Sequence, residues 1–261
     1  MLGKLLKYDL RYVYKTLGAY YIVAIVAAVI GTLLNKIHHA PFIIDFLGDF
    51  LANASLGLAA GIMISTFTRA ICSRFRQSLY GDEAYLTHTL PVSRLKLFTA
   101  KFISAIITLL ISATVVAITM LILFHEHIHL EDLSITIPFT SFTPLYCFAV
   151  LTLLVIVQSI FIIMCGFSGI VIGHRFDTAR GIISFIAGFG CYFLTGGLLI
   201  GLIFLLSNFD PELSALITYG HQPSLPTLIN CAWICTAAYA TITAILFATN
   251  VKLLNRGVNV E

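Results

Sequence analysis

Three histidines near the middle of the chain are the residues best suited to chemistry. His125, His127 and His129 alternate with other residues, and Glu131 and Asp132 follow them. Imidazole and carboxylate groups are common ligands of zinc and copper ions. The run offers many donors without a defined geometry, so we interpret it as a solvated, pH-sensitive loop. The three histidines remain an alternative metal site.

Two other catalytic patterns are missing from the sequence. It has no GxxxxGK[ST] loop to bind the phosphates of ATP and no GxSxG turn to carry a nucleophilic serine. Outside the histidine run, an intramembrane enzyme would have Gln158 and Ser159 as its candidate groups. We therefore expect no enzymatic activity and no cofactor in this chain, and we rank an intramembrane enzyme last among the functions considered.

Composition indicates the elements that must position any site. The 261 residues are 59% hydrophobic and 10% charged, whereas soluble domains carry about 25% charged residues. Six apolar runs lack Asp, Glu, Lys and Arg and are each long enough to cross a hydrocarbon core of about 30 Å as a helix. The sequence therefore predicts an all-α polytopic membrane protein that forms a single transmembrane domain, 1–261. The expected spans are roughly 17–34, 50–68, 102–124, 145–173, 182–206 and 228–251.

Basic residues indicate the orientation of these spans. Of the fifteen Lys and Arg residues, all except Lys36 fall on one side of the six-span topology. Because cytoplasmic loops carry the excess of Lys and Arg, we expect both termini and the polar segment 69–101 to be cytoplasmic.

The first 17 residues have the pattern of an amphipathic helix. At about 100° per residue, leucines and Val13 fall on one face and the basic residues on the other. Such a helix is suited to lie on an anionic membrane surface, so we expect an interfacial helix over 2–17 before the first span. A frayed basic tail is the alternative. The basic residues are Lys4, Lys7, Arg11 and Lys15.

The segment 69–101 is the longest polar interruption, and its pattern predicts ordered structure. We expect the second helix to run past Arg76 to Gly81, a short helix over 82–88 capped by Asp82, a turn at Pro91, and Ser93 as the cap of the third span. The acids Asp82 and Glu83 could meet a basic pocket, and Tyr85 and Leu86 could serve as apolar anchors.

Two further features concern the spans and the loop 208–227. Asp210, Pro211 and Glu212 have the pattern of a helix start, which predicts a short helix in that loop.

Pairs of glycines four residues apart allow close approach of helices. These pairs are Gly57 and Gly61, Gly169 and Gly173, and Gly197 and Gly201.

Two blocks of the sequence resemble a known family. The opening MLGKLLKYDLR is similar to the interfacial helix, and GDEAYLTHTLPVSRLKLFTAK to the characteristic cytoplasmic loop, of the six-span permease subunits of type II ABC exporters. The resemblance is greatest to the small permeases of Gram-positive bacteria. The six-span topology with both termini in the cytoplasm extends the resemblance over nearly the whole chain.

The resemblance implies an assembly of two permeases and two separate ATPase subunits in a bacterial plasma membrane, with ATP and Mg held by the ATPase. The helix 82–88 would be the coupling helix that docks on the ATPase, through Asp82, Glu83, Tyr85, Leu86 and His88. The substrate route would lie between the two permeases along the second and fifth spans, which carry Asn53, Gly57, Gly61, Gly197 and Gly201.

The neutral interior of the spans fits hydrophobic or amphipathic cargo, and among family substrates we expect peptides such as toxins or antimicrobial peptides. Membrane lipid is a further partner, and nucleic acid is not. An unpowered immunity or sensor protein that binds amphipathic peptides is the alternative function.

Overall fold

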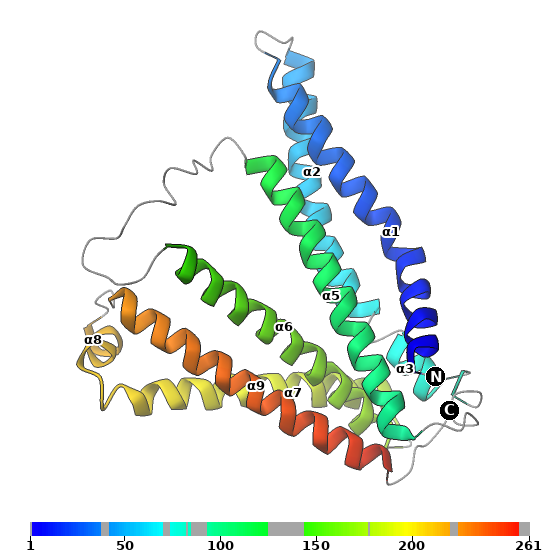
Figure 1. Cartoon of the computed structure of the whole chain (residues 1–261), viewed down its shortest axis with the longest axis vertical. Helices are drawn as coiled ribbons and strands as arrows, with labels where there is room; N and C mark the ends of the chain where they lie inside the picture. The colour runs from blue at the N-terminus through cyan, green and yellow to red at the C-terminus, as the bar shows by residue number, and fades with distance from the viewer. Residues whose placement is uncertain are drawn as a thin grey trace. The chain divides into compact units, whose positions relative to one another are not determined.

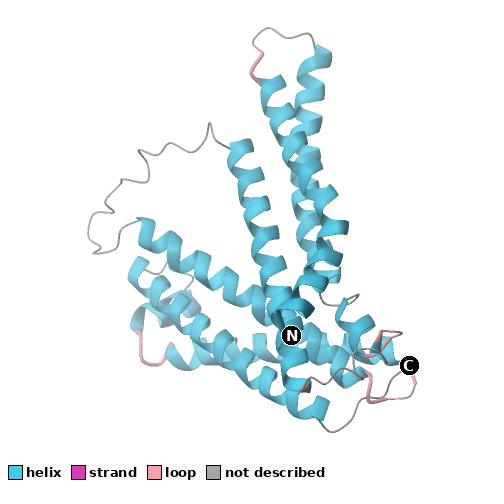
Figure 2. Ribbon diagram, turned by 45° about the vertical axis from the view of Figure 1, so that its right-hand side comes forward, coloured by secondary structure: helices cyan, strands magenta, loops and turns pink. Residues whose placement is uncertain are grey.

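The computed structural model describes residues 2–37, 42–69, 74–81, 83–84, 93–124, 144–176, 178–219 and 224–255, and most of these residues are helical. Figure 2 shows helices and connecting loops, with no strand in those ranges. Six of the helices are long and apolar enough to cross a membrane. The predicted fold class of an all-α, multi-pass membrane protein is confirmed at this level.

The chain divides into two compact units, 1–129 and 130–259, with the last two residues assigned to the first unit. The first contains α1 (Leu2–Asn35), α2 (Phe42–Phe67), α3 (Arg74–Leu79) and α5 (Arg94–Phe124). Within this unit α1, α2 and α5 pack against one another in pairs (Figure 1). Their core is a cluster of buried apolar side chains from α1 and α2, namely Val13, Leu17, Tyr21, Ala24 and Ile62.

The second unit contains α6 (Pro144–Gly173), α7 (Arg180–Leu206), α8 (Pro211–Tyr219) and α9 (Leu225–Asn255). Helix α6 is its centre, because both α7 and α9 pack mainly against it. Gly169 and Gly173 lie against the backbone of α7. On the side of α9, the buried Asn250 donates through Nδ2 to Ser168 Oγ at 2.8 Å. Close backbone approach and one buried hydrogen bond thus hold α6 to its two neighbours.

The six predicted spans agree with the six long helices, but one expected boundary is wrong. Helix α1 runs without a break through Leu17, where we expected an interfacial helix to end. No proline interrupts residues 2–35, so the backbone hydrogen bonds continue from the polar turns into the apolar ones. Helix α2 is assigned to Phe67, and α3 covers 6 residues that stop before Gly81 as predicted. Residues 70–73 lie outside the described part, so the expected continuation of the second helix stays a prediction.

Helix starts follow the predicted caps. Ser93 stands directly before α5, and its carbonyl accepts from the Leu97 amide at 3.1 Å. Asp210 caps α8, since its Oδ1 accepts from the Glu212 amide at 3.0 Å. Glu212 in turn reaches the start of α9, where its Oε2 accepts from the hydroxyls of Ser224 at 2.5 Å and Thr227 at 2.7 Å. One carboxylate therefore joins α8 to the N-terminus of α9.

Candidate functional site

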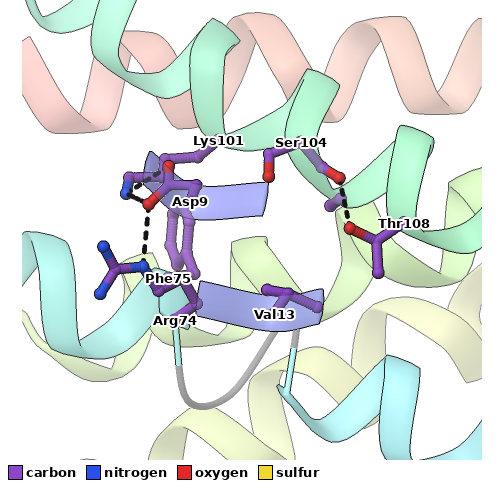
Figure 3. A pocket seen from close by; sticks show the side chains of 8 residues that line it. Asp9, Val13, Arg74, Phe75, Lys101, Ser104 and Thr108 are labelled. Carbon is purple, nitrogen blue, oxygen red and sulfur yellow. Dashed lines mark hydrogen bonds and ion pairs between the residues drawn. The ribbon is translucent and has the colours of Figure 1, made fainter. Parts of the chain in front are cut away.

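Four charged side chains from the first unit meet in one network. Asp9 comes from α1, Arg74 from α3, Lys101 from α5, and Glu83 follows α3. Arg74 Nε donates to Asp9 Oδ1 at 2.8 Å, and Lys101 Nζ lies 2.7 Å from both Asp9 carboxylate oxygens (Figure 3). Arg74 Nη1 also lies 2.9 Å from both Glu83 oxygens. Two acids and two bases thus alternate along the network.

Exposure is highest at Glu83, the outer end of this network, and lowest at Asp9. The side chain of Glu83 is 47% exposed, that of Arg74 14%, that of Lys101 6% and that of Asp9 2%. Burying a charge is costly unless an opposite charge and hydrogen bonds compensate it. Asp9 compensates both buried cations, and Glu83 compensates Arg74 as well.

Aromatic side chains hold the polar segment in place beside these charges. The Arg74 guanidinium lies 4.7 Å from the centroid of the Tyr12 ring, a cation–π distance. Phe75 of α3 and Phe98 of α5 are fully buried and meet edge to face with centroids 5.9 Å apart. Burial alone would lower the pKa of Arg74, but the carboxylates of Asp9 and Glu83 outweigh it and raise this pKa above its usual value. Arg74 is therefore a permanent cation in this site.

A small cavity lies beside the network, bounded by Asp9, Val13, Arg74, Phe75, Lys101, Ser104, Ala105 and Thr108 (Figure 3). Its volume is about 10 Å³, which is close to the minimum that one water molecule requires. The cavity is too small for a substrate or a cofactor. What the arrangement can do is hold the Arg74–Glu83 segment to α1 and α5 by ion pairs.

Polar contacts continue from the charged network along α5. Thr108 Oγ1 donates to the carbonyl of Ser104 at 2.8 Å. One turn further, Ser112 Oγ lies 2.6 Å from Tyr21 Oη of α1 and 2.7 Å from Thr66 Oγ1 of α2. These buried hydroxyls join α1, α2 and α5 inside the first unit. The site is thus anchored in the helix packing that surrounds it.

The predicted coupling residues are described only in part. Glu83 lies at the exposed end of the network and bonds to Arg74. Asp82, Tyr85, Leu86 and His88 lie outside the described residues, so the short helix over 82–88 stays a prediction.

Among the predicted membrane-surface residues, Lys7, Arg11 and Lys15 are exposed on α1, and the side chain of Lys4 lies outside the described part. Their contact with a membrane stays a prediction.

The glycines proposed for a substrate route or dimer interface differ from the other glycine pair. A Cβ atom added at Gly57, Gly61, Gly197 or Gly201 would meet no atom within 4 Å, and all four are exposed. A Cβ at Gly169 or Gly173 would instead collide with the backbone of α7. Asn53 is also exposed, and its Nδ2 donates to the carbonyl of Asp49 at 2.9 Å. The first four glycines are therefore not explained by packing within either unit.

The alternative metal site falls outside the described residues, which resume only at 144 after Phe124. The run from His125 to His129 also satisfies the HExxH spacing, which sequence reasoning overlooked; that motif binds zinc only when it is helical and a third ligand is present. Over the parts of the chain that are described, no three His, Cys, Asp or Glu side chains gather in a metal-binding group.

Sequence reasoning did not place Asp9, Arg74 or Lys101 in a site, although a signal for Asp9 was present. At about 100° per residue, Asp9 falls opposite the basic stripe, among the apolar residues Leu2, Leu5 and Val13. An acid on the apolar face of a helix needs a buried cation as its partner.

Sequence alone could not identify those partners, because Arg74 and Lys101 are 65 and 92 residues away. In comparisons with protein-family models, curated proteins and solved structures, the chain matches none of them.

Proposed function

We propose that this chain is the membrane subunit of an ATP-driven exporter of the type II ABC class, energised by a separate ATPase subunit that docks on the segment around 82–88. Such a subunit needs a polar segment that is fixed to the membrane helices, because a loose loop cannot transmit force. The observation that supports the proposal best is the Asp9 network, which attaches the Arg74–Glu83 segment to both α1 and α5.

The proposed assembly contains two copies of the chain in a bacterial plasma membrane, with both termini in the cytoplasm. The open glycine faces of α2 and α7 support contact between copies, since glycine weakens a helix by about 1 kcal/mol relative to alanine and no packing within either unit uses these four. Hydrophobic or amphipathic molecules, with peptides as the first choice, are the proposed cargo. ATP and Mg would be bound by the partner subunit.

Docking is tested by co-expressing the tagged chain with the separate ABC ATPase subunits of the same genome. Glu83→Lys and Tyr85→Asp should abolish co-purification of the ATPase, because they remove an acid and an apolar anchor from the docking segment. Lys252→Glu, a charge reversal at an exposed residue of α9, is the matched control and should keep it. Equal recovery of the ATPase with all three variants would exclude docking at this segment.

Transport is tested in liposomes with the co-purified complex. Amphipathic peptides should raise ATP hydrolysis, and stimulation by glycolipids or drugs instead would reject the proposed cargo. Cells that stay protected against a toxic peptide when every such ATPase is deleted would favour the unpowered immunity protein. Transport against a gradient by the chain alone would refute the proposal.

A further inference from the structure

The order in which Glu83, Arg74, Asp9 and Lys101 are bonded bears on how the docking segment, Arg74–Glu83, acts on the membrane helices. One end of the network, Glu83, is its most exposed member and belongs to the segment, and the other end, Lys101, belongs to α5. Between them stand Arg74 and then Asp9, each bonded to the next residue along the network. A displacement of the segment at Glu83 therefore has a continuous path of ion pairs to α5.

Asp9 of α1 joins the two parts of this path, Arg74 of α3 and Lys101 of α5. Its Oδ1 accepts from Arg74 Nε at 2.8 Å and from Lys101 Nζ at 2.7 Å, so α3 and α5 are joined through one oxygen atom of α1. Without that carboxylate, Arg74 and Lys101 would lose the acid that joins them, in a site where both are largely buried. Burying a charge without an opposite charge beside it is costly, so the ion-pair attachment of α3 to α5 would be lost.

A second, apolar attachment makes the role of Asp9 testable. Phe75 packs edge to face on Phe98 and is 1% exposed. This contact does not depend on charge, so it should keep α3 near α5 when Asp9 is neutral. Loss of Asp9 should therefore loosen the position of the segment without unfolding the unit.

We propose that Asp9 is the positioning residue of the docking segment: it fixes the Arg74–Glu83 segment, α1 and α5 as one body, so that movement of the segment displaces α5. The inference rests on the proposed function, because it explains how a docked ATPase would move a span. Its structural part concerns this chain alone and can be tested without any partner.

The first experiment measures the distance between spin labels on the chain in nanodiscs, in a cysteine-free background. Labels at Gln77 of α3 and Lys96 of α5 are suitable because both residues are exposed. The distribution should be narrow in the unmutated protein and about twofold wider in Asp9→Asn, because the local attachment is weakened while the global fold persists. Asp9→Glu, which keeps the carboxylate, should restore a narrow distribution.

Two further variants keep the test decisive. Ser112→Ala removes the hydroxyl that joins α1, α2 and α5 but leaves the charges intact, so its distribution should stay narrow. Lys101→Met cuts the path at α5 while Asp9 keeps Arg74, and it should widen the distribution even if Asp9→Asn does not fold. A narrow distribution in Lys101→Met, or equal widening in Ser112→Ala, would overturn the inference.

The second experiment separates docking from coupling in the complex with the ATPase. Asp9→Asn should still co-purify with the ATPase, because it removes no side chain of the docking surface, yet lose the cargo-stimulated part of ATP hydrolysis. Retained stimulation in Asp9→Asn would overturn the inference. Failure of the unmutated chain to bind any ATPase would overturn the proposed function instead, and the label distances would then still decide the role of Asp9.

Discussion

Alanine substitution at two glycines of the second unit should give opposite results, although both glycines belong to the same kind of pair. Gly169 of α6 lies against α7: a Cβ there would stand 2.8 Å from the Gly188 amide nitrogen and 2.9 Å from its Cα, and would also collide with the carbonyl oxygen of Ser184. Gly197 of α7 is exposed, and a Cβ there would meet nothing within 4 Å.

The magnitudes follow from these distances. Normal carbon contacts are about 3.5–4.0 Å, and a gap of about 0.5–1 Å already forfeits a quarter to a half of the contact energy. Because the atoms opposite Gly169 are backbone, α6 and α7 must separate by roughly that much, and overpacking of this kind costs about 1–3 kcal/mol. Alanine gains up to about 1 kcal/mol of helix propensity at either position, and at Gly197 it meets no opposition. The overpacking cost therefore sets the difference, and we expect Gly169→Ala to lower the free energy of unfolding by about 2 kcal/mol relative to Gly197→Ala.

Unfolding of both variants can be followed in mixed micelles of increasing denaturing detergent. The emission of Trp233, the single tryptophan, is a suitable signal because its indole nitrogen donates to Tyr146 Oη at 3.0 Å within the same unit. Equal midpoints for the two variants would refute the close approach of α6 and α7. A loss of self-association in Gly197→Ala, with monomer stability kept, would support the proposed contact between copies.

Two more predictions concern the second unit. Hydrogen bonds from Ser224 and Thr227 hold the pKa of Glu212 below its usual value, so the attachment of α8 to α9 is complete above the unfolded pKa of about 4.3 and is lost as pH falls through the lower folded pKa. A pH titration of Trp233 emission should show this acid transition. If the transition remains in Glu212→Gln, a group other than Glu212 causes it. Asn250→Ala should lower the free energy of unfolding by about 1–2 kcal/mol, because it removes a buried interhelical hydrogen bond and its side-chain packing. Asn230→Ala, at an exposed position of α9, is the control in the same detergent titration, and equal losses in the two would contradict a specific role for Asn250.

The helix boundaries and the candidate site could be predicted only in part. Ser93 and Asp210 were identifiable because capping depends on residues within one turn of the chain. We expected the second helix to continue toward Gly81 because the sequence beyond Thr68 contains no proline or glycine before it; the structure describes α3 from Arg74 but not residues 70–73. Glu83 was identified as an exposed acid, but its pairing with Arg74 needed the tertiary structure.

The sequence by itself determined the six spans and the helical class, because hydrophobic runs of membrane length are a local property that backbone hydrogen bonding in lipid forces into helices. Only the tertiary structure decided that Asp9, an acid on the apolar face of α1, lies between Arg74 and Lys101. It also decided that Gly169 is packed while Gly197 is open. Such pairings depend on which helix faces meet, and the helices concerned are far apart in the sequence. Helical periodicity shows which face of a helix is buried, but it does not show which other helix covers that face.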